Sequence, residues 1–111
     1  MGMTQERYAV GTILGTGAAI NVKCGFIPRY VELLNASDSN MIKMEWFKGM
    51  AAGYAFKEKT GTAYIARTIL TSAGISEYAG SDSQGGGQGF TLGTDSDMNG
   101  SGDTIYYLAV R

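Results

Sequence analysis

The chain has 111 residues, of which 44% are hydrophobic and 17% are charged, and its formal net charge is −1. This length and balance indicate one folded domain and exclude a chain that is disordered throughout. Without a basic or an acidic surplus, neither nucleic acid nor an anionic membrane is an expected partner, and the low net charge does little to oppose self-association.

The counts of individual residue types indicate the fold class and the compartment in which the chain folds. Seventeen Gly and seven Tyr against one Pro favour an all-β chain with many turns. The single Cys24 excludes an internal disulfide, and no apolar run reaches membrane-spanning length. Because no secretory signal pattern is recognisable, we expect folding in a reducing cytoplasm.

Turn residues divide the chain into short segments with strand patterns. Residues 1–7 predict a flexible N-terminal arm, and residues 8–111 predict a single antiparallel β-sandwich domain with a jelly-roll-like arrangement. The predicted strands span residues 8–14, 19–24, 29–35, 41–46, 62–71, 75–79, 90–92 and 104–111. Residues 47–56 fit either a helical turn or a broad loop, because Gly49 and Gly53 favour neither regular state.

Several of these segments alternate between apolar and polar residues, which predicts one buried face. The residues expected to face the core are Ile20, Val22, Cys24, Val31, Leu33, Ile42, Met44 and Trp46. Cys24 is therefore interpreted as a core thiol rather than a nucleophile. Trp46 is likewise interpreted as a core residue, and the alternative is a sugar-stacking platform formed with Tyr54.

The last predicted strand, Thr104 to Arg111, differs because both of its faces are apolar. One face carries Ile105, Tyr107 and Ala109, and the other carries Tyr106, Leu108 and Val110. Such a strand lies at the centre of a covered sheet or is covered by another subunit. Tyr106, Leu108 and Val110 are therefore the candidate residues for an interface.

No constellation of catalytic residues is recognisable. The chain has no His, which removes Ser-His-Asp and Cys-His catalysis and most transition-metal sites. Gly15 to Ala19 resembles a phosphate loop only in its glycines, since it lacks the Gly-Lys-Ser/Thr ending and a following helix. We therefore expect no catalytic residues, no cofactor and no enzymatic activity.

Two loops have alternative interpretations. In "DSDMNGSGD", Asp95, Asp97 and Asn99 match the first half of a calcium loop, but Tyr106 stands where the bidentate Glu belongs. A structural turn is therefore preferred over a weak calcium site. The low-complexity segment Gly80–Gly89 predicts a solvent loop, and the alternative is a loop that orders against a neighbouring subunit.

Four segments resemble small virion proteins of tailed phages. These are "GFIPRYVELLNAS" (residues 25–37), "EWFKGM" (45–50), "SAGISEYAG" (72–80) and "GFTLGTDSDMNGSGDTIYYLAVR" (89–111). The resemblance covers roughly residues 8–111, and its motifs are structural rather than catalytic. It implies that Gly25 and Pro28 shape a corner between strands. It also implies that Asn99 and Gly102 shape the turn before the last strand, and that Tyr106 and Tyr107 pack its two faces.

The function implied by this resemblance is that of a virion structural protein, made in the host bacterial cytoplasm and located in the virion. A capsid decoration or cement protein is the preferred interpretation, and its expected partners are the major capsid protein or other virion proteins. Self-association into a homo-oligomer is also expected, with a trimer preferred. The alternative is a glycan- or receptor-binding module of a head or tail fibre. A small hydrolase is a third, less favoured interpretation.

Overall fold

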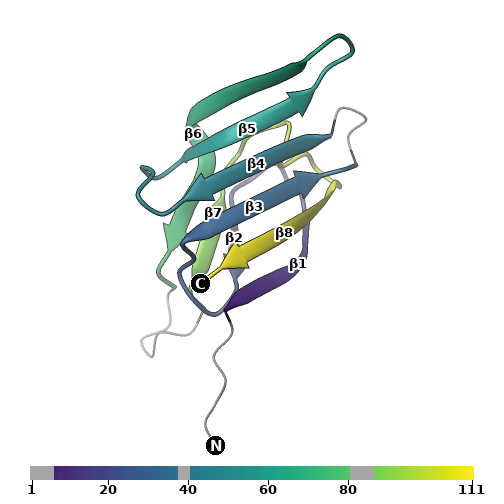
Figure 1. Ribbon diagram of the computed structural model, residues 1–111. Helices are drawn as coiled ribbons and strands as arrows, with labels where there is room; N and C mark the ends of the chain where they lie inside the picture. Colours follow the sequence, from purple (N-terminus) through teal and green to yellow (C-terminus); the bar gives the residue numbers. More distant parts are fainter. Residues whose placement is uncertain (1–6, 38–40, 81–86) are drawn as a thin grey trace, which may run out of the picture.

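The computed structural model describes residues 7–37, 41–80 and 87–111 (Figure 1). Most of the predicted arm and parts of two predicted loops, residues 1–6, 38–40 and 81–86, lie outside the described residues. The strands are β1 (Tyr8–Leu14), β2 (Ile20–Lys23), β3 (Tyr30–Asn35), β4 (Ile42–Phe47), β5 (Tyr54–Thr60), β6 (Ile65–Tyr78), β7 (Gly89–Leu92) and β8 (Thr104–Val110). In the described ranges no helix has the length and apolar character needed to cross a membrane.

All eight strands belong to one antiparallel sheet with the order β1-β8-β3-β4-β5-β6-β7-β2. The sheet folds over on itself, so that β7 and β2 lie behind the layer formed by β8, β3 and β4 (Figure 1). The predicted all-β antiparallel sandwich of a single domain is confirmed. Its two layers are parts of one continuous sheet, and the pairing of β1 with β8 and of β2 with β7 gives the jelly-roll-like nesting of early and late strands.

Strand β6 carries the sheet from one layer to the other. Its pairing with β5 shifts between Tyr54 and Ala55, and Ala73 has a positive φ of 65° at this point. A Cβ at Gly74 would lie 2.7 Å from the Gly53 carbonyl oxygen, so only glycine fits this crossing of two backbones. The two strands predicted for residues 62–71 and 75–79 are therefore one bent strand.

The core lies between the layers and consists of the inward residues of alternating strands. The fully buried apolar residues include Val31, Leu33, Ile42, Met44, Trp46, Phe90, Leu92, Ile105 and Ala109. The predicted core-facing residues on β3 and β4 are confirmed, as is Val22, whereas Ile20 and Cys24 are half-buried at its margin.

One strand was missed. Residues 47–56 were predicted as a helical turn or loop, but β5 starts at Tyr54 and continues to Thr60. Its inward residues include Lys57 and Lys59, which pair in register with Met44 and Ile42 of β4. A strand with lysines on its inner face shows no apolar alternation, so its pattern could not be recognised locally.

Candidate functional site

The outer face of β8 carries the three residues predicted as interface candidates. β8 lies between β1 and β3, which confirms the predicted central position of this strand. Ile105 and Ala109 are buried on its inner face. Tyr106 on the outer face is 51% exposed, and Leu108 and Val110 are half-buried. Within the described chain, the sandwich therefore covers only one of the two apolar faces.

Neighbouring strands extend this outer face into a larger apolar surface. In the pairing register, Val10 of β1 lies opposite Leu108, and Leu34 of β3 lies opposite Tyr106. Tyr8 and Val10 are 58% and 65% exposed. We call this surface the outer apolar patch and define it by Tyr8, Val10, Leu34, Tyr106, Leu108 and Val110. Side chains of this kind on a protein surface are typical of an interaction site.

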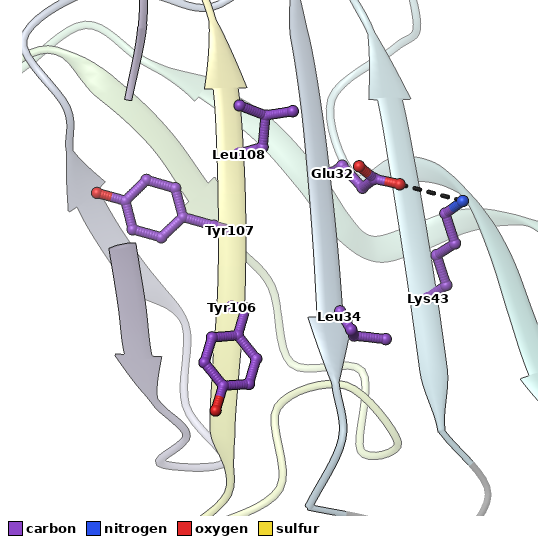
Figure 2. A pocket seen from close by; sticks show the side chains of 6 residues that line it. All are labelled: Glu32, Leu34, Lys43, Tyr106, Tyr107 and Leu108. Carbon is purple, nitrogen blue, oxygen red and sulfur yellow. Dashed lines mark ion pairs between the residues drawn. The ribbon is translucent and has the colours of Figure 1, made fainter. Parts of the chain in front are cut away.

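The patch contains a shallow hollow with a volume of about 350 Å³. Figure 2 shows Tyr106 and Leu108 on β8, Leu34 on β3, and the ion pair between Glu32 and Lys43 at the border of the hollow. The Lys43 Nζ lies 3.0 Å from Glu32 Oε2, and this contact raises the pKa of Lys43. Apolar side chains thus lie beside a charged border, which is the composition of a protein interface with a polar rim.

Tyr107 is a neighbour of the hollow whose side chain belongs to the other face. Its ring lies against Gly11 of β1, where a Cβ would come within 2.8 Å of the Tyr107 Cε2 atom. The ring also meets Phe90 edge to face, with the ring centroids 5.7 Å apart. Burial raises the pKa of Tyr107. Tyr106 and Tyr107 therefore lie on opposite faces of β8, as the resemblance implied.

Further from β8, polar and charged groups join the apolar residues of the outer face. The Tyr30 hydroxyl donates a hydrogen bond of 2.7 Å to Glu45 Oε2. Partial burial, this hydrogen bond and the nearby Glu32 all raise the pKa of Tyr30 well above its usual value. On the next strands Arg67 contacts Glu58 at 2.8 Å. The outer face over β4, β5 and β6 is thus mixed, because the exposed Phe47, Ile65 and Ile69 lie on β4 and β6 among these polar and charged groups.

Cys24 occupies the margin of the core at the end of β2. Its thiol donates a hydrogen bond of 3.3 Å to the Phe26 carbonyl oxygen. Burial raises the pKa of this thiol, which keeps it protonated at neutral pH. This environment is that of a packing cysteine, because a reactive cysteine needs a lowered pKa.

The three calcium candidates lie in the loop between β7 and β8, but the carboxylates of Asp95 and Asp97 form ion pairs with lysine side chains. Lys57 Nζ lies 2.9 Å from Asp95 Oδ1 and 2.6 Å from Asp97 Oδ2, and Lys59 Nζ lies 3.1 Å from Asp97 Oδ1. Hydrogen bonds from both lysines hold the pKa of Asp97 below its usual value. Among the residues described, no group of three or more Cys, Asp and Glu side chains could hold a metal ion. The ammonium groups of Lys57 and Lys59 thus already contact the carboxylate oxygens that a calcium ion would need as ligands.

Asn99 is separate from these carboxylates and fully buried. Its Oδ1 accepts hydrogen bonds from the backbone N–H groups of Thr16 and Gly17, and its Nδ2 donates to the carbonyl oxygens of Ala18 and Gly93. Every hydrogen-bonding position of the amide is therefore used by backbone. Gly102, the other turn residue that the resemblance singled out, has a positive φ of 85°. The loop between β7 and β8 therefore has a structural role, because its buried Asn99 fixes it to the turn between β1 and β2.

The alternative platform of Trp46 and Tyr54 is not exposed as a stacking surface. Trp46 is 1% exposed and belongs to the core, as preferred from the sequence. Its Nε1 finds no hydrogen-bond partner among the described residues. Next to it, under the β4–β5 connection, is a hollow of about 460 Å³ that Lys48, Met50 and Glu77 help to line. Tyr54 is half-buried, so only one of the two rings reaches the surface.

The comparisons with known proteins yield no relative. No protein-family model matches the chain, and neither a curated protein nor a solved structure matches it. The class of this protein therefore rests on its fold and its surface. The fold defines a small antiparallel β-protein, and the outer apolar patch is its most distinctive surface.

The contribution of β1 to this patch was missed in the sequence. Tyr8, Val10 and Leu14 were assigned to a strand without a prediction of which face they occupy. The available signal is that Tyr8 to Leu14 contains no charged residue, so neither face of this strand is marked as the solvent face.

Proposed function

We propose that this protein is a structural protein without catalytic activity, which assembles into a homo-oligomer and decorates the capsid of a tailed phage. The single observation that carries the proposal is the outer apolar patch. On this surface Tyr8, Val10 and Tyr106 are each more than half exposed. Exposed side chains of this size are stabilised when a second protein surface removes them from water.

The chemistry of the described residues supports a contact role over an enzymatic one. The chain has no His, and its one thiol is protonated and hydrogen-bonded within the fold. The hollow on the patch is lined by Tyr106, Leu108 and Leu34 beside one ion pair, without a nucleophile that has an adjacent base. A surface of tyrosine and leucine with a charged border is suited to anchoring a partner.

The assignment to a virion is supported by the resemblance of the segments at residues 25–37 and 89–111 to small tailed-phage virion proteins. These segments contain β3 and β8, the two strands that form the centre of the outer apolar patch. Identical contacts repeated around an axis bury such a surface in every subunit. A trimer is the preferred assembly, because decoration proteins commonly occupy threefold positions.

The self-association is tested by light scattering on the purified protein. We expect an assembly of three chains, or of a multiple of three, for the wild type, and the loss of this threefold assembly for Tyr106→Ser combined with Leu108→Ser. The matched control is Ile69→Ser, which removes another exposed apolar residue from β6, away from the patch. A wild type that remains monomeric at all concentrations, or a control that dissociates as readily as the double variant, would contradict the proposed contact.

The location is tested on particles produced by the bacterial strain that encodes the chain. Quantitative mass spectrometry of purified virions should find the protein in a fixed ratio to the major capsid protein. Gold-labelled antibodies should bind to the head. If the protein is absent from purified particles, the virion assignment is wrong, whatever its oligomeric state.

A second candidate function, a glycan-binding module of a head or tail fibre, is favoured by one observation. Tyr106 is exposed beside the Glu32–Lys43 ion pair, so an aromatic ring and charged hydrogen-bonding groups border the same hollow. Sugars are commonly bound by an aromatic face together with polar groups at the ring edge. A glycan array probed with the wild type and with Tyr106→Ala tests this function. Equal signals from both proteins would exclude this hollow as the glycan-binding site.

A further inference from the structure

Strand β1 forms a free edge of the sheet that is not protected against pairing. On one side it pairs with β8 along its full length, and no strand among the described residues pairs with its other side. Its sequence, YAVGTIL, contains no charged residue and no proline. Natural edge strands usually carry lysine, proline or a bulge, because an unprotected edge adds a strand from another chain.

The hydrogen bonds to β8 determine which backbone groups of β1 point to the free side. Gly15 N donates to Asp103 O at 2.8 Å, and Arg111 N donates to Arg7 O at 2.8 Å. In the register between these two bonds, the odd-numbered residues of β1 form the hydrogen-bonded pairs with β8. The even-numbered residues, Tyr8, Val10, Thr12 and Leu14, therefore direct their N–H and C=O groups away from β8.

We propose that β1 pairs antiparallel with β1 of a second copy of this chain, around a twofold axis at Gly11. In this register Tyr8 lies opposite Leu14 of the second copy, and Val10 lies opposite Thr12 of the second copy. All four free N–H groups and all four free C=O groups of each strand then find partners. This edge contact is separate from the outer-patch contact and does not depend on the virion assignment.

The side chains suit a second copy of the same strand. The outer-face pairs, Tyr8 with Leu14 and Val10 with Thr12, are uncharged, so no like charges oppose each other. Val10 and Leu14 are 65% and 66% exposed in the single chain and gain apolar neighbours across the new pair. Because Tyr8 and Val10 belong to the outer apolar patch, pairing also joins the patches of two copies into one continuous surface.

The other free edges fit this role less well. β2 has only four residues, and one of them is Lys23. The first half of β6 carries Arg67, and the pairing irregularity opposite Tyr54 and Ala55 interrupts the strand. Charges and irregularities of this kind are the features that discourage edge pairing. β1 is longer than β2 and lacks both features.

Disulfide trapping tests the register directly. In a Cys24→Ser background, which removes the only native thiol, Val10→Cys combined with Thr12→Cys places the introduced thiols on opposite members of one hydrogen-bonded pair. The Cα atoms of such a pair lie about 5.5 Å apart, which is within disulfide range. We expect a covalent dimer under mild oxidation, and the absence of a cross-linked dimer at every protein concentration overturns the proposal.

The two single-cysteine variants are the matched controls. With the axis at Gly11, the thiols of two Val10→Cys chains, or of two Thr12→Cys chains, are not opposite each other and should remain free. Efficient cross-linking of either single variant would place the axis at residue 10 or residue 12 and overturn the proposed register. Adding Tyr106→Ser and Leu108→Ser to the double-cysteine variant should leave its cross-linking intact, which separates this contact from the patch contact.

A second measurement tests the edge without new thiols. Thr12→Lys places a charge on the free edge, and Thr60→Lys makes the same change on β5, which has a strand on each side. We expect Thr12→Lys to raise the dissociation constant of the twofold contact at least tenfold in light scattering, and Thr60→Lys to leave it unchanged. Equal behaviour of the two variants, with unchanged thermal unfolding, would overturn the proposal.

Discussion

The side-chain amide of Asn99 holds the backbone N–H of Thr16 at 2.9 Å, although the two residues are 83 positions apart in the chain. This contact joins the loop between β7 and β8 to the turn between β1 and β2. Asn99 itself is fully buried, but Thr16, Gly17 and Ala18 are exposed, so water can replace only part of these hydrogen bonds when the side chain is removed. The amide therefore acts as an internal brace between an early and a late part of the chain.

Replacing Asn99 with alanine should lower the free energy of unfolding by about 2 kcal/mol, because a buried side chain is removed and four backbone groups lose their partner at once. Chemical denaturation measures this loss. The control is Asn21→Ala on β2, where an exposed amide accepts one hydrogen bond from Thr91. This control should change the free energy by less than about 0.5 kcal/mol. Equal losses in both variants would contradict the bracing role of Asn99.

Lys57 and Lys59 contact the same aspartate but should contribute differently to stability. The Lys57 side chain is 13% exposed and contacts both Asp95 and Asp97, whereas Lys59 is more exposed and contacts Asp97 alone. Lys57→Met leaves two partly buried carboxylates without their main partner and should cost about 2 kcal/mol. Lys59→Met should cost less than about 1 kcal/mol. Thermal unfolding of both variants in one buffer tests this order, and the reverse order would refute it.

The same ion pairs predict a loss of stability in acid. The pKa of Asp97 is lowered by hydrogen bonds from Lys57 and Lys59, so this carboxylate stabilises the fold above its unfolded pKa of about 3.9. The contribution is lost as the pH falls through the lower pKa of the folded state. Asp97→Asn should therefore be less stable than the wild type at pH 7, and the difference should shrink as the pH falls below about 4.

Alkaline pH acts on the other partner of these ion pairs. Burial lowers the pKa of Lys57, but the hydrogen bonds to Asp97 and Asp95 outweigh it, so the net shift is upward. The contribution of Lys57 is therefore complete below its unfolded pKa of about 10.4 and is lost as the pH rises through the folded value. Unfolding curves across the pH range should thus show that the wild type loses stability in acid, through Asp97, and again in alkali, through Lys57. A difference between the wild type and Asp97→Asn that does not change with pH would contradict this assignment.

Gly11 should be intolerant of even a methyl group. A Cβ at this position would lie 2.8 Å from Cε2 of Tyr107, whose ring is held against Phe90. We expect Gly11→Ala to cost about 2 kcal/mol through overpacking. In a Tyr107→Leu background the same change should cost clearly less, because leucine lacks the ring atoms that collide. A double-mutant cycle measures this coupling, and an additive result would show that Tyr107 is not the cause.

The strands could be predicted where each one carries its own apolar alternation. β4 is an example, since Ile42, Met44 and Trp46 mark its inner face within six residues. β5 could not be predicted, because its inward lysines are neutralised by Asp95 and Asp97 about 40 residues later in the chain. Only the folded chain brings these charges together, so the local sequence of β5 looks like that of an exposed segment.

The candidate surface was predictable in part for the same reason. Tyr106, Leu108 and Val110 were recognisable because β8 is apolar on both faces within a single segment. The residues that β1 contributes to the outer apolar patch depend on the register of β1 with β8. This register places Val10 opposite Leu108, almost one hundred residues away in the chain. No local pattern specifies that register. Likewise, the lysines that occupy Asp95 and Asp97 could not be foreseen from the calcium-like spacing of the loop.

The position of β8 between β1 and β3 also constrains the order in which the chain can fold. β1 is the first strand of this sheet along the chain, yet its only strand neighbour within the described chain is β8, the last strand of the sheet. Until Thr104–Val110 leave the ribosome, β1 has no strand to pair with, and one edge of β3 stays open. Pairings between segments so distant in sequence are slow to form. Between the synthesis of β1 and that of β8, the nascent chain therefore presents one unpaired apolar strand and one open edge of β3, and a chaperone or a neighbouring nascent chain has access to them during this period.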